Sequence, residues 1–241
     1  MSRFYTPTEL DLHQVIHLPE PVFHHWVRVL RAQVGDTATL FNGQGGEFLA
    51  QLTQIDKKAA SAKLVEFNPI DRALDFQVQI GLVMSKGDRM DYAIQKATEL
   101  GVHQIQLLTS ERCEMRLKYD RDQKKIDHWQ AIAIAACEQC GLNRIPQILP
   151  PQPLETWCSH NTDPLRLVLA LQANTQPLVQ PLPSQISLLI GAEGGLSAAE
   201  IAYSEQYGFK RWQLGERVLR TETAPVVALS ILADRHQNQS L

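Results

Sequence analysis

The chain has 241 residues, of which 44% are hydrophobic and 20% are charged, and its formal net charge is −3. These values are typical of an ordinary globular protein, no apolar stretch approaches the length that crosses a bilayer, and the N-terminal stretch MSRFYTPTELDLHQ is too polar for a secretory signal. We therefore expect a cytoplasmic protein without a membrane-spanning segment, and one that lacks the overall basic charge of most nucleic-acid-binding proteins.

The first 70 residues predict a small β-rich domain, in the form of a barrel. Its short segments alternate apolar and polar side chains and are separated by turn signals such as Asn42-Gly43. A short helix is expected over residues 20–30, and Pro69 marks a linker over residues 68–72. The expected strands are residues 37–43, 47–55 and 61–67. We predict one domain over residues 1–70 and a second over residues 74–241.

Beyond the linker, apolar segments of strand length alternate with helical segments, which is typical of a mostly parallel α/β sheet. Asp88 is expected to cap the first helix and Gly101 to end it, because glycine tolerates the left-handed conformation. Ser197 and Glu200 have the spacing of a capping box at the start of a later helix. The expected strands are residues 76–84, 104–110, 165–171, 186–191 and 210–214, and the other expected helices are residues 125–140 and 226–233.

Four cysteines raise the question of disulfides or a metal site. Cys137 and Cys140 form a C-x-x-C motif, but it lies within the helical stretch AIAIAACEQCG, and no second Cys or His pair follows with the spacing of a zinc site. A chain of this size without a secretory signal needs no disulfides for stability. We therefore expect reduced, structural cysteines and no metal.

Three loops are candidates for a ligand site, because ligands of open parallel sheets bind beyond the carboxyl ends of the strands. They are residues 171–174, 191–196 and 214–219. The second is rich in glycine, but the chain contains no dinucleotide fingerprint, no P-loop and no hydrolase signature. The third continues into GERVLRTETA, whose polar side chains precede an apolar helix and so lie at a helix N-terminus. These residues predict a glycine-lined ligand site beside a polar helix start.

Several long motifs in a fixed order carry a resemblance to a known family. They are KGDRMDYAIQKATELG, SERC, AIAIAACEQCGLNRIPQI, LLIGAEGGL and LGERVLRTETA. With them the chain closely resembles, over nearly its whole length, the ribosomal RNA small subunit methyltransferase E family of the SPOUT superfamily. The resemblance implies S-adenosylmethionine (SAM)-dependent methylation of N3 of a uridine in 16S ribosomal RNA. It also implies an N-terminal PUA-like RNA-binding barrel and a trefoil knot formed by the three loops.

The resemblance also implies where the cofactor binds. Two positions depart from the family: Ala192 stands where proline is common, and Pro225 stands where alanine or a similar residue is common. Pro225 suits a first helical turn, where its missing N–H costs little, whereas Ala192 would loosen the loop modestly. The implied cofactor-binding residues are Leu171, Gly191, Glu193, Gly195, Leu214, Gly215, Leu219, Thr223 and Ala224.

Methylation at N3 requires removal of the imide proton and stabilisation of the resulting anion. Arg220 is the candidate for the stabilising cation, and Glu222 would position it or act as the base. The alternative for Glu222 is a purely electrostatic role beside the helix dipole. Candidates for contact with the RNA backbone are Arg3, Arg28, Arg31 and Arg217.

We expect a homodimer. Residues 226–233 and 131–136 are apolar on nearly every face, and a helix of that kind must be covered on every side. A partner chain, which the resemblance implies, would supply the cover; the alternative is that both helices are central in one chain.

Two other functions stay open: a SPOUT methyltransferase acting on transfer RNA or on a ribose 2′-oxygen, and a non-catalytic RNA-binding protein. The intact glycines of residues 191–196 argue against the latter.

Overall fold

The computed structural model describes residues 2–113, 115, 119–171, 178 and 180–237. Internal contacts divide the chain into two compact units. The N-terminal unit comprises Met1–Ala73 together with Cys137–Ile145, and the C-terminal unit comprises Leu74–Ala136 and Pro146–Leu241. The linker expected from Pro69 falls next to this boundary, but nothing in the sequence assigned residues 137–145 to the N-terminal unit.

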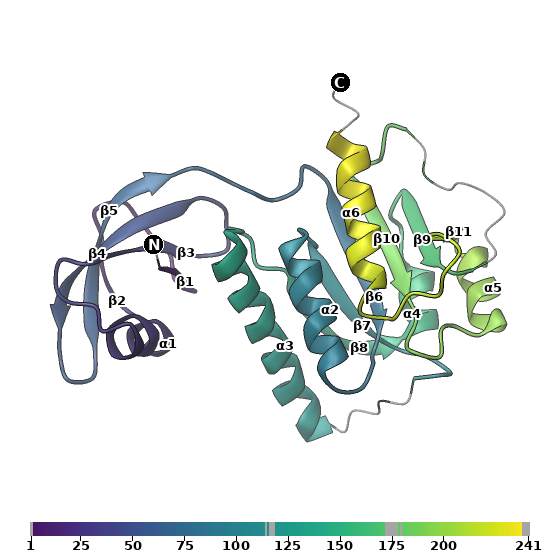
Figure 1. The fold of residues 1–241 in the computed structure, drawn as a ribbon, viewed down its shortest axis with the longest axis horizontal. Helices are drawn as coiled ribbons and strands as arrows, with labels where there is room; N and C mark the ends of the chain where they lie inside the picture. Colours follow the sequence, from purple (N-terminus) through teal and green to yellow (C-terminus); the bar gives the residue numbers. More distant parts are fainter. Residues whose placement is uncertain (1, 114, 116–118, 172–177, 179, 238–241) are drawn as a thin grey trace. The chain divides into compact units, whose positions relative to one another are not determined.

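The N-terminal unit is built on a five-stranded sheet with the strand order β1-β3-β4-β5-β2 (Figure 1). The expected strands are present as β3, Thr37–Phe41, β4, Glu47–Ile55, and β5, Ala60–Asn68, which form antiparallel pairs. Two further strands, β1, Arg3–Tyr5, and β2, Val15–His17, have three residues each. Segments this short carry no readable alternation, and for that reason the sequence did not predict them.

The helix expected over residues 20–30 is present in two parts. A short α1, Glu20–Phe23, continues directly into the π-helical segment η1, His24–Val29, whose wider turns bury Trp26. Arg31 follows in the left-handed conformation, with a φ of 57°. The sequence predicted the helix but not its widened second half.

Residues 137–145 are tied to the rest of the N-terminal unit by side-chain hydrogen bonds. The Glu138 carboxylate accepts from the backbone N–H of Tyr5 at 2.9 Å. The Asn143 side chain donates to the carbonyl of Ile70 at 2.6 Å and accepts a hydrogen bond from Arg3. The motif CEQCGLNR therefore includes residues that hold the N-terminal unit together.

The C-terminal unit contains a six-stranded sheet with the order β11-β9-β10-β6-β7-β8, and every neighbouring pair is parallel. The expected parallel α/β sheet is therefore confirmed. One strand, β8, was not expected, because Pro150, Pro151 and Pro153 are uncommon in strands. β8 lies at the edge of the sheet, and an edge position tolerates proline. The strands are β6, Gln77–Val83, β7, Gln104–Thr109, β8, Gln147–Pro153, β9, Leu165–Leu169, β10, Gln185–Ile190, and β11, Lys210–Trp212.

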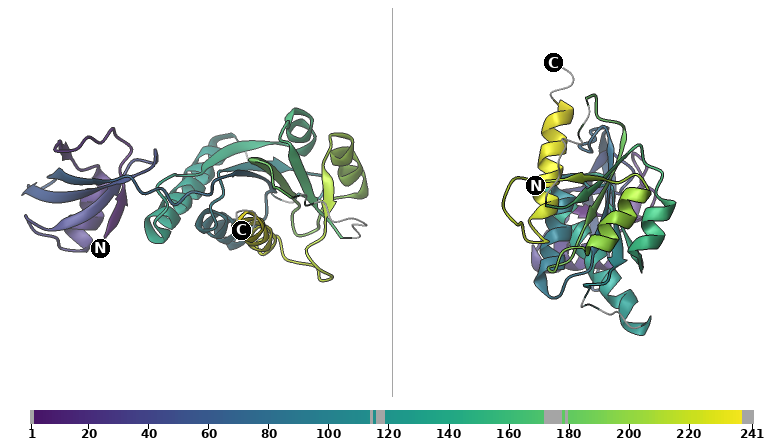
Figure 2. Two further views of the ribbon diagram at one scale, coloured as in Figure 1. Left: turned by 90° about the horizontal axis from the view of Figure 1, so that it is seen from above. Right: turned by 90° about the vertical axis from the view of Figure 1, so that its right-hand side faces the viewer.

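Helices cover both faces of this sheet (Figures 1 and 2). Side chains along each strand alternate between two cores: Leu107 faces the core that includes Met90 and Leu229, whereas its neighbour Leu108 faces the core that includes Trp157. Burial on both faces explains why the strands are apolar almost continuously. One face carries α2, Asp88–Glu99, α3, Tyr119–Cys140, and α6, Ala224–Gln237, and the other carries α4, Leu154–His160, and α5, Ala198–Gln206.

The helix ends test three sequence predictions. Gly101 adopts a φ of 83°, and the Ser197 capping box forms as expected, with the Glu200 carboxylate 2.7 Å from the Ser197 backbone nitrogen. The Asp88 prediction is wrong, because Gly87 is the N-cap residue of α2 and makes no side-chain cap, while Asp88 is the first helical residue. An acidic residue in that first turn still interacts favourably with the helix dipole.

Candidate functional site

A cavity of about 400 Å³ lies in the C-terminal unit at the carboxyl ends of β9, β10 and β11. Each strand contributes the residues that directly follow it, so the three loops proposed from the sequence meet at one place. Of the first loop, residues 172–174 lie outside the described part of the chain. The predicted site residues that line the cavity are Leu171, Gly191, Glu193, Gly195, Leu214, Arg217, Leu219 and Ala224.

The loop after β10 requires glycine at two positions. A Cβ at Gly191 would lie 2.9 Å from the carbonyl carbon of Gly195, closer than real side chains come, and Gly195 has a φ of 64°. Ala192, which departs from the family, is 5% exposed and packs in an apolar cluster with Leu189 and Leu196. The loop is therefore closely folded. Ala192, which stands where the family commonly has proline, is well packed.

Two arginines from other parts of the C-terminal unit hold this glycine loop. Arg112, which follows β7, donates to the carbonyl of Gly194 at 2.7 Å, and Arg89 in the first turn of α2 forms an ion pair with Glu193 at 2.6 Å. Burial raises the pKa of Glu193, but hydrogen bonds from its own backbone and from Arg89 outweigh burial and leave that pKa below its usual value. Both arginines belong to family-like motifs, KGDR and SERC, but spacing alone did not reveal their role.

The polar start of α6 forms another side of the site. Thr221 is 6% exposed and lines the cavity. Arg220 and Glu222 do not line it: the Arg220 side chain is 79% exposed, the Glu222 side chain is 14% exposed, and their charged atoms lie 3.9 Å apart. Glu222 Oε2 is buried and, within the described part of the chain, has no hydrogen-bond partner.

The remaining cofactor candidates, Gly215 and Thr223, are not among the residues that line the cavity. Gly215 lies in the loop after β11 with a φ of 85°, a conformation that favours glycine. The Thr223 backbone N–H donates to the carbonyl of Arg220 at 2.9 Å. Thr223 therefore shapes the turn that precedes α6, whereas Gly215 shapes the loop that follows β11.

The four arginines predicted to contact RNA differ in their surroundings. Arg217, Arg28 and Arg31 are exposed. The Arg3 side chain is only 11% exposed, forms an ion pair with Glu47, and lies 4.2 Å above the Phe41 ring. These internal contacts argue against a direct role of Arg3 in RNA binding.

The cysteines are free thiols. Burial raises the pKa of both Cys137 and Cys158 to about 12, so both stay protonated at neutral pH. Over the described ranges, no group of three or more His, Cys, Asp or Glu side chains could hold a metal ion. No helix that the structure describes is long and apolar enough to span a membrane.

Comparison with known proteins places this geometry in a family. Residues 72–233 match an RNA methyltransferase domain, and residues 18–65 match an RNA methyltransferase PUA domain. The ribosomal RNA small subunit methyltransferase E of Buchnera aphidicola from Schizaphis graminum is 35% identical over 96% of this chain and 95% of its own length. The chain belongs to the ribosomal RNA small subunit methyltransferase E family. Its Bacillus subtilis member is 32% identical over 87% of this chain and 86% of its own length.

Two similar solved structures contain SAM. A putative methyltransferase from Legionella pneumophila, in complex with the bound cofactor SAM, is 36% identical with a TM-score of 0.91, over 95% of this chain and 96% of its own. The small subunit methyltransferase E of Neisseria gonorrhoeae, bound to S-adenosyl methionine, is 34% identical with a TM-score of 0.90, over 96% of both chains. The present fold therefore agrees with these experimental structures over nearly its full length.

Proposed function

We propose that this protein is a SAM-dependent methyltransferase that acts in the cytoplasm on N3 of a uridine in 16S ribosomal RNA of the small ribosomal subunit. The observation that carries the proposal is the cavity at the ends of β9, β10 and β11, formed by the three loops that the family resemblance assigns to SAM. We also propose that these loops form the trefoil knot of the superfamily.

The residues of the cavity suit SAM. Its volume of about 400 Å³ is in the usual range for small-molecule sites. Leu169, Ile190 and Leu219 supply apolar walls for an adenine ring, and the lack of side chains at Gly191 and Gly195 lets a ligand approach the backbone closely. When bound there, SAM would supply an electrophilic methyl group.

The residues at the start of α6 would act on the acceptor base. Removal of the N3 proton leaves a negative charge that is shared with the two uracil carbonyls. The exposed guanidinium of Arg220 would stabilise that charge. Glu222, whose Oε2 has no hydrogen-bond partner among the described residues, would accept the proton or position Arg220. Arg217, Arg28 and Arg31 would hold the RNA backbone.

We further propose that the protein works as a homodimer. In α6, Val226, Val227 and Ile231 are only partly buried, while Leu229 and Leu232 are fully covered by the sheet's core. A second chain would cover the apolar side that α6 leaves partly open.

The proposal is tested by offering isotopically labelled SAM with three RNA substrates. They are small ribosomal subunits from cells lacking this methylation, naked 16S ribosomal RNA, and unmodified transfer RNA. We expect the label in 16S ribosomal RNA and none in transfer RNA. Label in transfer RNA alone would show that the enzyme has another substrate, and bound SAM without any labelled RNA would support a non-catalytic RNA-binding protein.

A further inference from the structure

A second cavity of about 800 Å³ adjoins the first within the C-terminal unit. The two cavities share Arg112, Glu193 and Gly194 in their walls. The second opens between the loop that joins β6 to α2 and the loop that follows β7. The mechanism proposed above uses neither of these loops, although both carry family-like motifs.

Among the described residues, the charges that line the second cavity are balanced. Three cations, Lys86, Arg89 and Arg112, line it together with three carboxylates, Asp88, Glu111 and Glu193. Arg89 and Glu193 neutralise each other at 2.6 Å. Asp88 and Glu111 are exposed and would repel a phosphate brought between them. The lining therefore suits a neutral polar group that needs both donors and acceptors.

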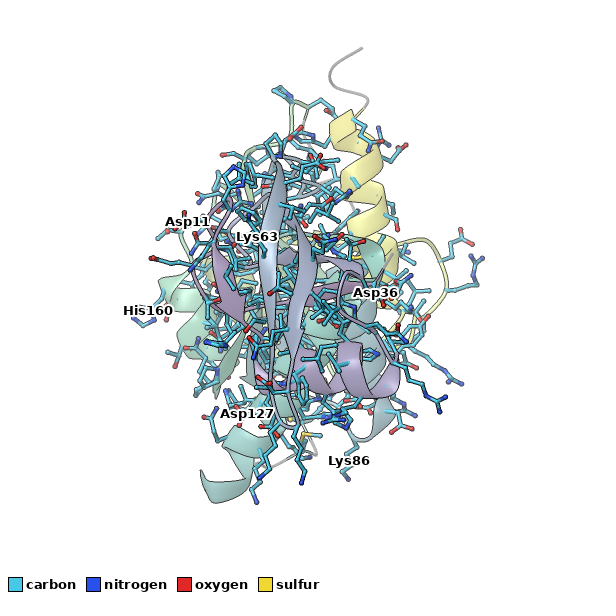
Figure 3. The ribbon with its side chains drawn as sticks, turned by 90° about the vertical axis from the view of Figure 1, so that its left-hand side faces the viewer. Asp11, Asp36, Lys63, Lys86, Asp127 and His160 are labelled. Carbon is cyan, nitrogen blue, oxygen red and sulfur yellow. The ribbon has the colours of Figure 1, made fainter. Side chains whose placement is uncertain are left out.

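Each of two segments supplies a donor and an acceptor: Lys86 and Asp88 lie at the start of α2, and Arg112 and Glu111 lie after β7. Lys86, labelled in Figure 3, is exposed just before the N-cap Gly87, and a Cβ at Gly87 would meet no atom within 4 Å. Arg112 stands at the shared wall, where its guanidinium is fixed by the Gly194 carbonyl. The cavity thus offers open space beside a fixed donor, Arg112, and beside the exposed side chains of Lys86, Asp88 and Glu111.

Enzymes that modify a base turn it out of its stack into a pocket that reads its hydrogen-bonding edge. That edge of uracil presents acceptor, donor and acceptor, namely O2, N3–H and O4. We propose, on the basis of the function proposed above, that the second cavity receives the target uracil. Lys86 and Arg112 donate to its carbonyls, and Asp88 or Glu111 accepts from N3–H, so that Glu222 keeps only the role of positioning Arg220. Cytosine lacks this N3 proton, so the carboxylates select uracil.

Carboxylate variants separate this inference from general attraction to RNA. Removal of a carboxylate from a surface that only attracts phosphates should tighten binding, whereas removal of an acceptor for N3–H should weaken it. We would prepare Asp88→Ala and Glu111→Ala, with Glu155→Ala on α4 as the matched control for the lost charge. Binding of small ribosomal subunits is measured with S-adenosylhomocysteine present, so no turnover is involved, and SAM affinity is measured by calorimetry.

We expect Asp88→Ala or Glu111→Ala to weaken subunit binding by about tenfold, the loss expected for one hydrogen bond to a base edge. SAM affinity should stay within about twofold, and Glu155→Ala should match the wild type in both measurements. Unchanged or tighter subunit binding by both variants would overturn the inference. A parallel loss of SAM affinity would also overturn it, because the second cavity would then belong to the cofactor site. A wild-type protein that binds neither SAM nor subunits would contradict the proposed function itself.

Discussion

Arg220 is the residue on which the proposed chemistry depends most. A cation aimed at a developing uracil anion acts in the transition state and not on the bound cofactor. We therefore expect Arg220→Ala to lower kcat by about 10²- to 10³-fold and to leave the dissociation constant of SAM nearly unchanged. Single-turnover methylation and calorimetry measure the two quantities. SAM binding that weakens in proportion to turnover would place Arg220 in the cofactor site.

Gly191 tests whether the glycine loop holds the cofactor. A Cβ there would lie 2.9 Å from the carbonyl carbon of Gly195, so Gly191→Ala forces the loop to move. Overpacking of this kind costs about 1–3 kcal/mol, and we expect SAM binding to weaken by about tenfold or more. Gly194→Ala in the same loop should have a smaller effect, because its Cβ would meet only the Arg112 side chain at 3.4 Å. Equal SAM affinities for all three proteins would contradict this account.

Single residues show what the sequence could and could not predict. Leu171 and Leu214 line the cavity as expected, because they follow closely on strands whose ends a parallel sheet brings together, and Leu219 lies farther along the loop after β11. Arg3 was a candidate for RNA contact, but it pairs with Glu47, a partner that lies 44 residues away. Local spacing carries no information about such a distant partner.

At the scale of elements, the capping box of α5 links the helix to a neighbouring loop. The Glu200 carboxylate accepts from the backbone nitrogens of Ser197 and Glu111, each at 2.7 Å, and Glu200 is only 5% exposed. Glu200→Ala leaves both N–H groups without this partner, and we expect the free energy of unfolding to fall by about 2–3 kcal/mol.

The control for Glu200 lies on the same helix. Glu205 pairs with Arg211 at 2.7 Å, but both side chains are more than a third exposed. Solvent screens such a pair, so Glu205→Ala should cost less than about 1 kcal/mol. Denaturant unfolding of both variants checks the difference. Equal losses would mean that the buried hydrogen bonds of Glu200 contribute no more than a surface ion pair.

Elements with a clear pattern of apolar residues were predictable, whereas short elements and a strand rich in proline were not. β6 and β10 are apolar over most of their length, so their type was clear from the sequence. β8 contains three prolines and was missed, together with the short helix α4 that directly follows it. The widened turns of η1 depend on how Trp26 packs in the core, which periodicity does not reveal.

At the scale of the whole molecule, the proposed dimer predicts that two inactive variants can complement each other. One variant carries Gly195→Arg in the cofactor loop, and the other carries Arg28→Glu with Arg31→Glu. If each site uses the cofactor loops of one chain and the N-terminal unit of the other, random exchange restores about a quarter of wild-type activity. If light scattering at micromolar concentration gives the mass of a monomer, the dimer proposal is wrong. A dimer that does not complement would reject only the shared site.

The division of the chain into units was partly predictable. The linker near Pro69 is visible as a break in pattern, and the match of residues 18–65 to a PUA domain agrees with a separate N-terminal unit. The contribution of residues 137–145 was hidden, because a continuous helix, α3, leads directly into this segment. Only long-range contacts such as Tyr5 to Glu138 reveal it.

The central claim is that the methyl group goes to N3 of uridine, and mass spectrometry of nucleosides tests it most directly. Small ribosomal subunits treated with the protein and SAM are digested to nucleosides, which are compared with standards of N3-methyluridine and 2′-O-methyluridine. We predict one new N3-methyluridine in the 16S ribosomal RNA, and its absence when Arg220→Ala replaces the wild type. Methylation on the ribose, or on a base other than uracil, would contradict the proposed mechanism.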